Sequence, residues 1–273
     1  MIEAGITLGQ ARIELPLDPL ENRILLCHAL RLPRVALITQ SERVLTPDET
    51  TLLNALVQRR LDGEPIAYIT GEREFFGLPF RVTPAVLIPR PDTELIVELA
   101  IDRLIPNGRL LDMGTGSGAI AVAVAHTRPD ADVTALDVSV AALEVARGNA
   151  DANGARVTFL RSDWYDALPA AAFDVIASNP PYIVAGDHHL AEGDLRFEPI
   201  DALTDHADGL SDLRRIVDGA IDRLVAGGWL LMEHGYDQAA AVRALLAARG
   251  FADVQSWRDL ADIERVSGGR RPA

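Results

Sequence analysis

Short apolar runs alternate with stretches of helical periodicity from about residue 92 onward. Runs of five or six residues rich in Val, Ile and Leu predict buried strands, and apolar residues at helical spacing predict helices. The predicted strands cover residues 109–113, 133–137, 157–161, 173–178 and 229–233, with a further pair near Val254 and Val266. The predicted helices cover residues 119–126, 140–149, 213–224 and 238–249. This alternation is typical of an α/β domain, in which helices cover both faces of a parallel sheet.

The first 70 residues show helical periodicity without intervening strands. Asp18-Pro19 suits the start of one helix, because proline fits the first helical position. Thr46 is followed three residues later by Glu49, which is the spacing of a capping box at the start of a second helix. We therefore predict a small all-helical domain over residues 1–70.

A third pattern separates these two regions. Residues 66–70 and 75–82 are rich in β-favouring side chains and are interrupted by glycine and proline. They predict a β-hairpin. The chain is thus expected to contain a helical domain (1–70), a β-hairpin connector (71–91) and an α/β domain (92–273).

The composition is that of an ordinary soluble protein, with 48% hydrophobic and 24% charged residues. No apolar run reaches the ~18 residues of a membrane span, and the first residues do not resemble a secretion signal. The single cysteine, Cys27, cannot form an internal disulfide. We therefore expect a cytoplasmic location.

The formal net charge is −14, and all 26 basic residues are arginine. Without lysine, the chain cannot form a Schiff base or supply the lysine of a P-loop. The negative charge argues against non-specific binding to nucleic acid, which requires neutralisation of phosphates. It favours a small-molecule substrate or a basic protein partner.

A glycine-rich loop follows the first predicted strand of the α/β domain, with the sequence Gly114-Thr115-Gly116-Ser117-Gly118. Glycine allows the backbone to approach a ligand closely, and the helix that follows offers free N–H groups. Asp137 ends the next strand, 19 residues after Gly118, where a carboxylate can accept the hydroxyl protons of an adenosine ribose. Both a nicotinamide cofactor and S-adenosylmethionine contain such a ribose.

The third predicted strand leads into Asp163 and Trp164. An acid at this strand end can accept a hydrogen bond from the amino group of adenine, and an aromatic ring can cover its face. Trp164 alone is more typical of a core residue. The order of the three strand ends favours the adenine role.

The fourth predicted strand leads into Asn179-Pro180-Pro181-Tyr182. The prolines stiffen this turn, and the Asn179 side chain and the Pro180 carbonyl supply two acceptors beside the Tyr182 ring. Two acceptors and a ring suit a planar –NH₂ group. Hydrogen bonds to its two protons can return lone-pair density to the nitrogen, which can then attack a methyl group placed in line with the lone pair. A nicotinamide-dependent dehydrogenase would have no use for this turn. If the first and fourth strands are neighbours, the turn and the glycine loop face one crevice.

Together, residues 112–118 and 179–182 resemble the class I S-adenosylmethionine-dependent methyltransferases that act on planar amino nitrogens. Further segments resemble the HemK/PrmC family of release factor glutamine methyltransferases, namely residues 63–71, 73–78, 87–94, 193–199 and 233–235. The resemblance covers essentially the full chain. It implies a seven-stranded Rossmann-like methyltransferase domain and an N-terminal helical domain that docks the substrate.

The resemblance also implies a reaction and its residues. The reaction is N5-methylation of the glutamine in the Gly-Gly-Gln motif of class I peptide chain release factors, with no metal and no direct nucleic acid or membrane partner. The residues implied for the methyl donor are Gly114, Thr115, Gly116, Ser117, Gly118, Asp137, Trp164 and Asn179. The residues implied for the glutamine amide are Asn179, Pro180, Pro181 and Tyr182, of which Asn179, Pro180 and Tyr182 are implied to be catalytic.

Two other functions stay open from the residues themselves. One is an adenine-N6 methyltransferase acting on nucleic acid, which the negative charge disfavours. The other is a non-catalytic adaptor that binds S-adenosylmethionine, which the intact Asn179-Pro180-Pro181-Tyr182 turn disfavours because a scaffold needs no amide acceptors.

An acidic segment, residues 184–213, holds eight acidic residues and only one basic residue. Because it follows the amide-binding turn, we expect it either to be a solvated loop or to dock a basic domain of the release factor. The adjacent His188 and His189 do not converge easily on one ion, so no metal site is expected. Arg90 and Glu94 are expected to brace the crevice or to form an ion pair.

Overall fold

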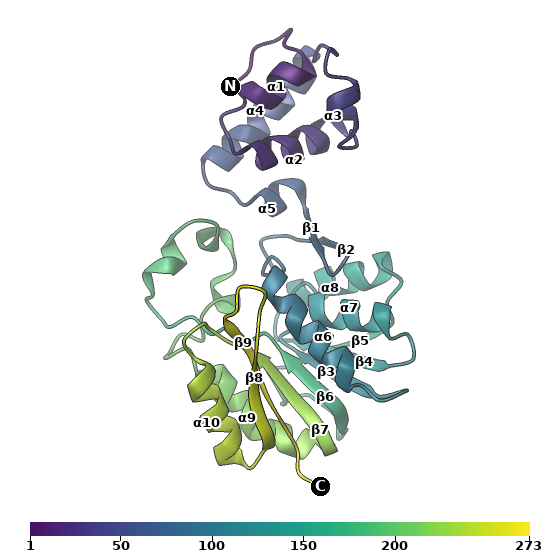
Figure 1. Ribbon diagram of the computed structural model, residues 1–273, viewed down its shortest axis with the longest axis vertical. Coiled ribbons are helices and arrows are strands. Elements are labelled where there is room, and N and C mark those ends of the chain that lie inside the picture. Colours follow the sequence, from purple (N-terminus) through teal and green to yellow (C-terminus); the bar gives the residue numbers. More distant parts are fainter. The chain divides into compact units, whose positions relative to one another are not determined.

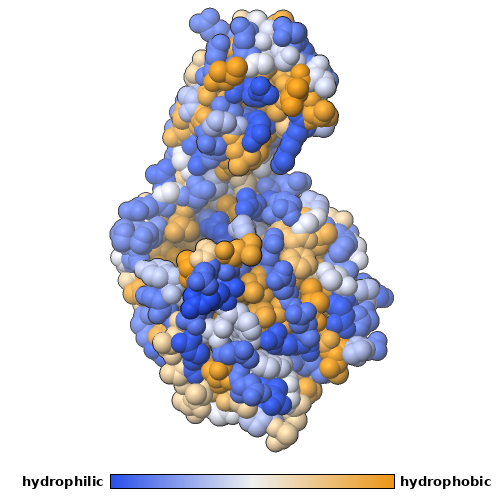
Figure 2. Space-filling model, viewed as in Figure 1, coloured by the Kyte–Doolittle hydropathy of each residue, from blue (hydrophilic) through white to orange (hydrophobic).

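The computed structural model describes residues 1–273, which divide into two compact units, Met1–Gly71 and Glu72–Ala273. Figure 1 shows the elements of each unit. Hydrophilic residues cover much of the visible face of both units, with apolar residues in small groups (Figure 2). None of the helices combines the length and the apolar character needed to span a bilayer.

The unit Met1–Gly71 is all helical. Its helices are α1 (Leu8–Glu14), α2 (Pro19–Leu30), α3 (Ala36–Thr39), α4 (Pro47–Leu61) and α5 (Ile66–Thr70). Fully buried leucines such as Leu25 and Leu53 form its core. The capping box predicted for α4 is present, since the Glu49 N–H donates to Thr46 Oγ1 at 3.2 Å and the Thr46 N–H donates to Glu49 Oε2 at 2.9 Å.

The prediction of extended structure over residues 66–70 is wrong, because this segment forms the short helix α5. The helical turn buries Ala67, Tyr68 and Ile69, and Ile69 joins the core of the helical unit. Gly71 ends the helix in the left-handed conformation. Burial of these side chains therefore outweighs their intrinsic preference for strands.

A β-hairpin does follow, formed by β1 (Glu72–Phe75) and β2 (Leu78–Arg81). Its two-residue turn consists of Phe76 and Gly77, which both have positive φ as in type I′ turns. The hairpin is shorter than the segment predicted for it.

The predicted fold class is confirmed by a seven-stranded sheet with the order β5-β4-β3-β6-β7-β9-β8. Its strands are β3 (Arg109–Met113), β4 (Asp132–Asp137), β5 (Val157–Arg161), β6 (Phe173–Ser178), β7 (Leu224–Glu233), β8 (Ala252–Arg258) and β9 (Glu264–Arg270). The sheet is mixed rather than parallel, because β9 runs antiparallel to both β7 and β8. The short loop between β8 and β9 leaves no room for the crossover that a parallel pair requires.

Helices cover the two faces of the sheet (Figure 1). They are α6 (Glu94–Arg103), α7 (Ala119–Thr127), α8 (Val140–Ala152), α9 (Ser211–Arg223) and α10 (Ala239–Arg249), of which α6 was not predicted. Successive residues of β3 face opposite sides, so Leu110 joins the core under α6 and α7 while Leu111 joins the core under α9 and α10.

The capping box gives a prediction for the helical unit. Thr46→Ala removes the side-chain acceptor at the start of α4, and we expect it to destabilise the unit by about 1 kcal/mol. Hydrogen exchange of the α4 amides measures this loss. Thr51→Ala, at an exposed position of the same helix, is the matched control and should leave exchange within about 0.5 kcal/mol of the wild type. Equal exchange in both variants would contradict the role of Thr46.

Candidate functional site

The strand order reverses between β3 and β6, which are parallel neighbours. In open α/β sheets, ligands bind beyond the carboxyl ends of the strands at such a point. The Ser178 hydroxyl donates to the Met113 carbonyl at 2.7 Å and joins the two strand ends. The loops that follow, Gly114–Gly118 and Asn179–Tyr182, therefore begin side by side.

The glycine loop has a backbone that only glycine adopts readily. Gly114, Gly116 and Gly118 have φ angles of +70°, +55° and +85°. A Cβ atom on Gly118 would lie 3.1 Å from Ala146, so a side chain at this position would push its neighbours apart. A Cβ atom on Gly116 would meet nothing within 4 Å, so the backbone there is open to a ligand.

Asp137 holds the glycine loop from the end of β4. Its Oδ2 accepts from the Gly116 N–H and its Oδ1 accepts from the Ser139 N–H, both at 2.9 Å. Burial raises the pKa of Asp137, and these two hydrogen bonds oppose the rise. Because each carboxylate oxygen has a second lone pair, Asp137 can still accept hydrogen bonds from a ligand.

A cavity of about 480 Å³ lies at this edge of the sheet, within the usual size range of ligand sites. Of the predicted site residues, it is lined by Gly114, Thr115, Gly116, Ser117, Asp137, Trp164, Asn179 and Pro181. Gly118, Pro180 and Tyr182 do not line it. With Asp137 included, five carboxylates and two guanidinium groups line it, which favours a ligand that carries positive charge. A second cavity, at the start of β4 and β5, contains none of the predicted site residues.

Trp164 adopts an unusual backbone conformation, with φ of +47°. Its ring lies beside Gly114, where a Cβ atom would be 3.7 Å from the ring. Its Nε1–H donates to Asp212 Oδ1 at 3.2 Å, so Asp212 fixes the ring. Asp163 also lines the cavity and forms an ion pair with Arg215 at 3.2 Å. Asp212 was not predicted as a site residue, because only its place in the acidic segment marked it.

The Asn179 side chain has a defined orientation at the cavity wall. Its Nδ2 donates to Thr93 Oγ1 at 3.2 Å, which leaves Oδ1 as the atom that can accept from a ligand. Tyr182 is turned away, and its hydroxyl donates to Glu233 Oε1 at 3.3 Å. Burial and the neighbouring Glu233 raise the pKa of Tyr182, so this phenol keeps its proton at neutral pH.

Asn149, on α8, is a site residue that was not predicted. It is 1% exposed, and its Nδ2 donates to the carbonyls of Ser117 at 2.8 Å and Arg81 at 3.0 Å. Its Oδ1 accepts from the Arg81 N–H at 2.7 Å. Asn149 thus ties the glycine loop to the hairpin strand β2. The sequence signal that could have identified Asn149 is a polar residue on the buried face of a predicted helix.

The acidic segment 184–213 is a folded loop with three short 3₁₀ helices: η2 (His188–Ala191), η3 (Leu195–Phe197) and η4 (Ile200–Ala202). Several of its acids make contacts that hold it in place. Asp205 accepts from three backbone N–H groups, and Glu198 is buried, pairs with Arg90 and accepts from the Ile88 N–H. A docking role for the segment stays a prediction.

The expected Arg90–Glu94 pair is not formed. Arg90 pairs with Glu198 instead, and Glu94 Oε1 accepts from the Phe76 N–H at 2.9 Å. Arg90 lines the cavity. Glu94 therefore braces the hairpin turn, and Arg90 anchors the acidic segment at the cavity.

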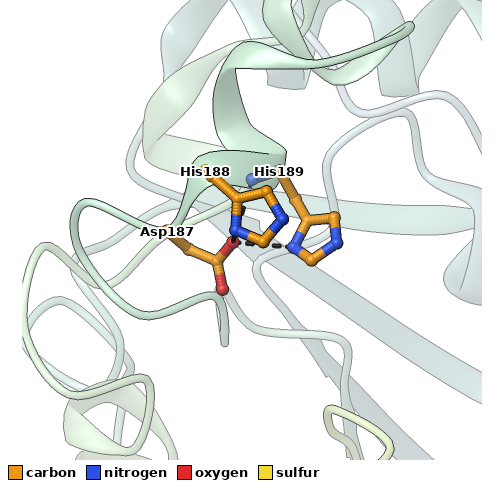
Figure 3. A group of neighbouring side chains, drawn as sticks. All are labelled: Asp187, His188 and His189. Atoms are coloured by element: carbon orange, nitrogen blue, oxygen red, sulfur yellow. Dashed lines mark hydrogen bonds and ion pairs between the residues drawn. The ribbon is translucent and has the colours of Figure 1, made fainter.

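Figure 3 shows the one cluster whose side chains have metal-binding chemistry, Asp187 with His188 and His189. Their potential ligand atoms lie within 4.8 Å of one another. Asp187 Oδ1 lies 2.7 Å from Nδ1 of His189 and also accepts from the His189 N–H at 2.9 Å. These contacts give Asp187 a structural role at the start of η2, and both histidines are exposed.

Asp112, in β3, is a buried acid under the glycine loop. Its Oδ2 accepts from the Thr115 hydroxyl at 2.6 Å and the Ala121 N–H at 3.2 Å, whereas Oδ1 has no partner. Burial raises the pKa of Asp112 to about 7. Between the ordinary pKa of an aspartate, about 4, and this value, the folded state binds more protons than the unfolded state.

We therefore expect the contribution of Asp112 to the free energy of unfolding to fall as the pH rises from 5 to 8. Asp112→Asn should remove this contribution, so its stability should decline less with pH than that of the wild type. Urea unfolding at several pH values measures the difference. The exposed Asp151→Asn is the control and should follow the wild type. Parallel pH profiles for the wild type and Asp112→Asn would contradict the prediction.

Two family models match the chain. Residues 91–193 match the methyltransferase small domain, and residues 3–71 match the PrmC N-terminal domain. The release factor glutamine methyltransferase of Burkholderia pseudomallei is 58% identical over 94% of this chain and 93% of its own length. The proteins of the same name from Neisseria gonorrhoeae and Escherichia coli are 52% and 46% identical, over 93% and 92% of this chain and 94% and 91% of their own lengths.

Solved structures share the fold. A methyltransferase from Pyrococcus furiosus superposes with a TM-score of 0.58 at 20% identity, over 79% of this chain and 98% of its own. The 16S rRNA N2 G1207 methyltransferase of T. thermophilus, solved with AdoMet and guanosine, has a TM-score of 0.54 at 25% identity. That match covers 73% of this chain and 49% of the other.

Proposed function

The chain belongs to the family of release factor glutamine methyltransferases, and from this premise we propose how its cavity carries out the family's reaction. The reaction transfers a methyl group from S-adenosylmethionine to a glutamine of a release factor. The acceptor we propose is the N5 nitrogen of the glutamine in the Gly-Gly-Gln motif of class I release factors. The observation that carries the proposal is that Asn179 and the glycine loop line one cavity.

The residues around this cavity fit the methyl donor. S-adenosylmethionine, when bound, supplies a sulfonium methyl group that an attacking nitrogen can take by direct displacement. Asp137 keeps acceptor capacity for the ribose hydroxyls, and the backbone at Gly116 is open to close approach. Trp164, held by Asp212, offers a flat face for adenine. The excess of carboxylates suits a donor with a positive sulfur.

The residues of the turn hold the acceptor nitrogen. We assign Asn179 Oδ1 to accept an N–H group of the glutamine amide, with Pro181 as the wall beside it. Pro180 and Tyr182, which do not line the cavity, hold the turn from behind. A hydrogen bond in this arrangement orients the amide and favours a pyramidal nitrogen. The lone pair is then no longer delocalised into the amide and can attack the methyl group. Because its pKa is raised, Tyr182 stays protonated and is not the base. After the nitrogen has taken the methyl group from the sulfonium, its extra proton passes to solvent water.

The alternative functions are not favoured. The relatives that match over nearly the full chain are named for glutamine methylation of a release factor, and a net charge of −14 does not suit a nucleic acid substrate. A non-catalytic adaptor would not need an oriented amide acceptor at the cavity. We propose that the N-terminal helical unit docks the release factor, and that the protein works in the cytoplasm, where release factors act.

A methyl-transfer assay tests the acceptor. We expect labelled methyl from the donor to reach a release factor and not an adenine-containing nucleic acid. Asn179→Ala should lose about 2–4 kcal/mol of transition-state stabilisation, a fall of roughly 30- to 1000-fold in kcat. Asn153→Ala, which removes the same side chain at the end of α8, is the matched control and should keep the wild-type rate. Transfer to nucleic acid, or an unimpaired Asn179→Ala, would refute the proposal.

Calorimetry of donor binding tests Asp137. Asp137→Asn removes the charge of the proposed ribose acceptor, and we expect the Kd for S-adenosylmethionine to rise about 10- to 100-fold, as for the loss of a charged hydrogen bond. Asp132→Asn lies at the opposite end of the same strand and serves as the control. If both variants bind the donor with wild-type affinity, Asp137 does not hold it.

A further inference from the structure

Gln238 lies where three separate backbone segments meet, and the reaction described above does not use it. It precedes α10 and does not line the cavity. Its Nε2 donates to the Tyr182 carbonyl at 2.9 Å and to the Gly209 carbonyl at 3.1 Å. Its Oε1 accepts from the Gly235 N–H at 2.8 Å. One side chain therefore joins the end of the turn Asn179–Tyr182, the acidic segment and the loop after β7.

The backbone partners fix the orientation of the Gln238 amide. The –NH₂ group faces two carbonyl oxygens, which can only accept, and the side-chain oxygen faces an N–H, which can only donate. In a flipped amide, the side-chain oxygen would face the two carbonyl oxygens, and the –NH₂ group would face the Gly235 N–H. Main-chain groups do not titrate or rotate to relieve such a conflict. The Gln238 amide therefore has a single orientation, in which it uses all three partners.

The loop that carries Gln238 is itself attached to the sheet. The Gly235 carbonyl accepts from the Gln238 N–H at 3.1 Å. The preceding residue, His234, is fully buried, and its ring nitrogens lie 2.8 Å from the Gly235 carbonyl oxygen and 2.7 Å from Ser267 Oγ. Ser267 belongs to β9, which pairs with β7. The sheet thus gives Gln238 a fixed base from which it holds the two other segments.

Close packing at Gly209 is a second observation that points to the same contact. Gly209 has a φ of +76°, and an added Cβ atom would lie 2.6 Å from the Tyr182 carbonyl oxygen and 2.8 Å from Gln238 Nε2. A side chain at this position would therefore force one of the two partners away. The meeting of Gly209, Tyr182 and Gln238 requires glycine both for its backbone conformation and for its lack of a Cβ atom.

On the acceptor side, Gln238 holds the far end of the turn. Asn179 begins the turn and donates to Thr93 Oγ1 at 3.2 Å. Tyr182 ends it, with its hydroxyl on Glu233 and its carbonyl on Gln238. The two prolines between these ends have restricted φ angles, so the turn moves as a stiff unit. A displacement of the Tyr182 carbonyl is therefore carried to Asn179 at the cavity.

On the donor side, the glutamine holds the chain just before α9. The Gly209 N–H donates to Asp205 Oδ1 at 3.0 Å, and Asp205 Oδ2 accepts from the N–H of Ser211, the first residue of α9, at 2.8 Å. The next residue, Asp212, accepts the Trp164 Nε1–H. The contact at the Gly209 carbonyl thus supports the start of the helix that fixes the Trp164 ring.

We propose that Gln238 is a positioning residue that holds the acceptor turn and the start of α9 at a fixed separation. The inference rests on the proposed function, in which Asn179 binds the acceptor amide and Trp164 covers the adenine of the methyl donor. A change in this separation moves the attacking nitrogen off the line of the sulfonium methyl group, and displacement is sensitive to such misplacement. Gln238 acts only through these contacts, because it does not line the cavity.

A variant of Gln238 in the full-length protein, with a release factor as methyl acceptor, tests the inference. Gln238→Glu keeps the shape and the oxygen that faces Gly235, but it places a second oxygen against the two carbonyls. We expect kcat per donor-binding site to fall about 10- to 100-fold and the Kd for S-adenosylmethionine to rise about 3- to 10-fold. Calorimetry gives the Kd and the number of binding sites, so a loss of folded protein does not lower this kcat.

Gln255→Glu is the matched control for this variant. Gln255 is exposed, and its side chain donates to the nearby Asp253 carbonyl at 3.4 Å. The same substitution there should leave kcat and Kd within about twofold of the wild type, as is usual for surface positions.

Gly209→Ala provides a second measurement that leaves Gln238 in place. The new Cβ atom must displace the Tyr182 carbonyl or Gln238 Nε2, and we expect kcat per binding site to fall about 10-fold. Gly154→Ala is its control, because Gly154 also has a positive φ, +63°, but a Cβ atom there would meet nothing within 4 Å. It contains the backbone strain alone and should keep kcat within about threefold of the wild type.

The remaining outcomes separate this inference from the proposed function. An undiminished kcat per site in Gln238→Glu, or an equal loss in Gly209→Ala and Gly154→Ala, overturns the positioning role. A fall in kcat with an unchanged Kd for the donor overturns the link to α9. In each of these cases, transfer by the wild type upholds the function. If the wild-type protein transfers no methyl group to a release factor, the proposed function fails, and the inference that rests on it fails with it.

Discussion

The parallel pairing of β3 with β6 is the constraint on which the site depends. The register runs from Leu110 opposite Val175 to Met113 opposite Ser178, so both strands end at the same level. The two loops then begin one strand spacing apart, about 4.8 Å. A slip of one residue would turn every side chain of one strand to the other face and separate the glycine loop from the turn. The Ser178 hydroxyl on the Met113 carbonyl secures this register at its end.

Around this register, buried polar groups hold the irregular backbone of the site. The glycine loop is held by the Leu136 carbonyl, by Asp137 and by Asn149. Asp112 and Glu233 each retain one unpaired buried oxygen close to these loops. Such groups lower stability, and these two lie beside loops whose shapes regular structure does not provide. The helical unit is built mainly on buried leucines and helix caps, and it too contains buried unpaired polar atoms, in Asn22 and Arg43.

Sequence reasoning was strongest where a single physical signal dominates. The bounds of β3, β5 and β6 were predicted correctly, because short runs rich in apolar and β-branched residues stand out between turns and helices. The mixed sheet and the helix α5 were predicted wrongly. The antiparallel pairing of β9 with β7 and the burial of residues 66–70 both depend on contacts between distant parts of the chain.

The residues on the cofactor side of the cavity could also be predicted from the sequence, because glycines and strand-end acids recur at fixed spacings. The residues behind the site could not be predicted. Thr93 contacts Asn179 across 86 residues and Glu233 contacts Tyr182 across 51, so both meet the turn only through the fold, although residue 233 belonged to a recognised motif without a role. Asn149 and Asp212 were likewise hidden, since a polar side chain in a helix gives no indication of its distant partner.

The contacts of Asn149 have an evolutionary consequence. All of its partner atoms in Arg81 and Ser117 belong to the main chain, so these hydrogen bonds do not depend on which side chains stand at the two positions. Asn149 itself has no such freedom, because no other side chain of its size offers two amide protons and a carbonyl in the same plane. Divergence along this lineage should therefore be lopsided, with an invariant asparagine at position 149 facing a variable residue at position 81.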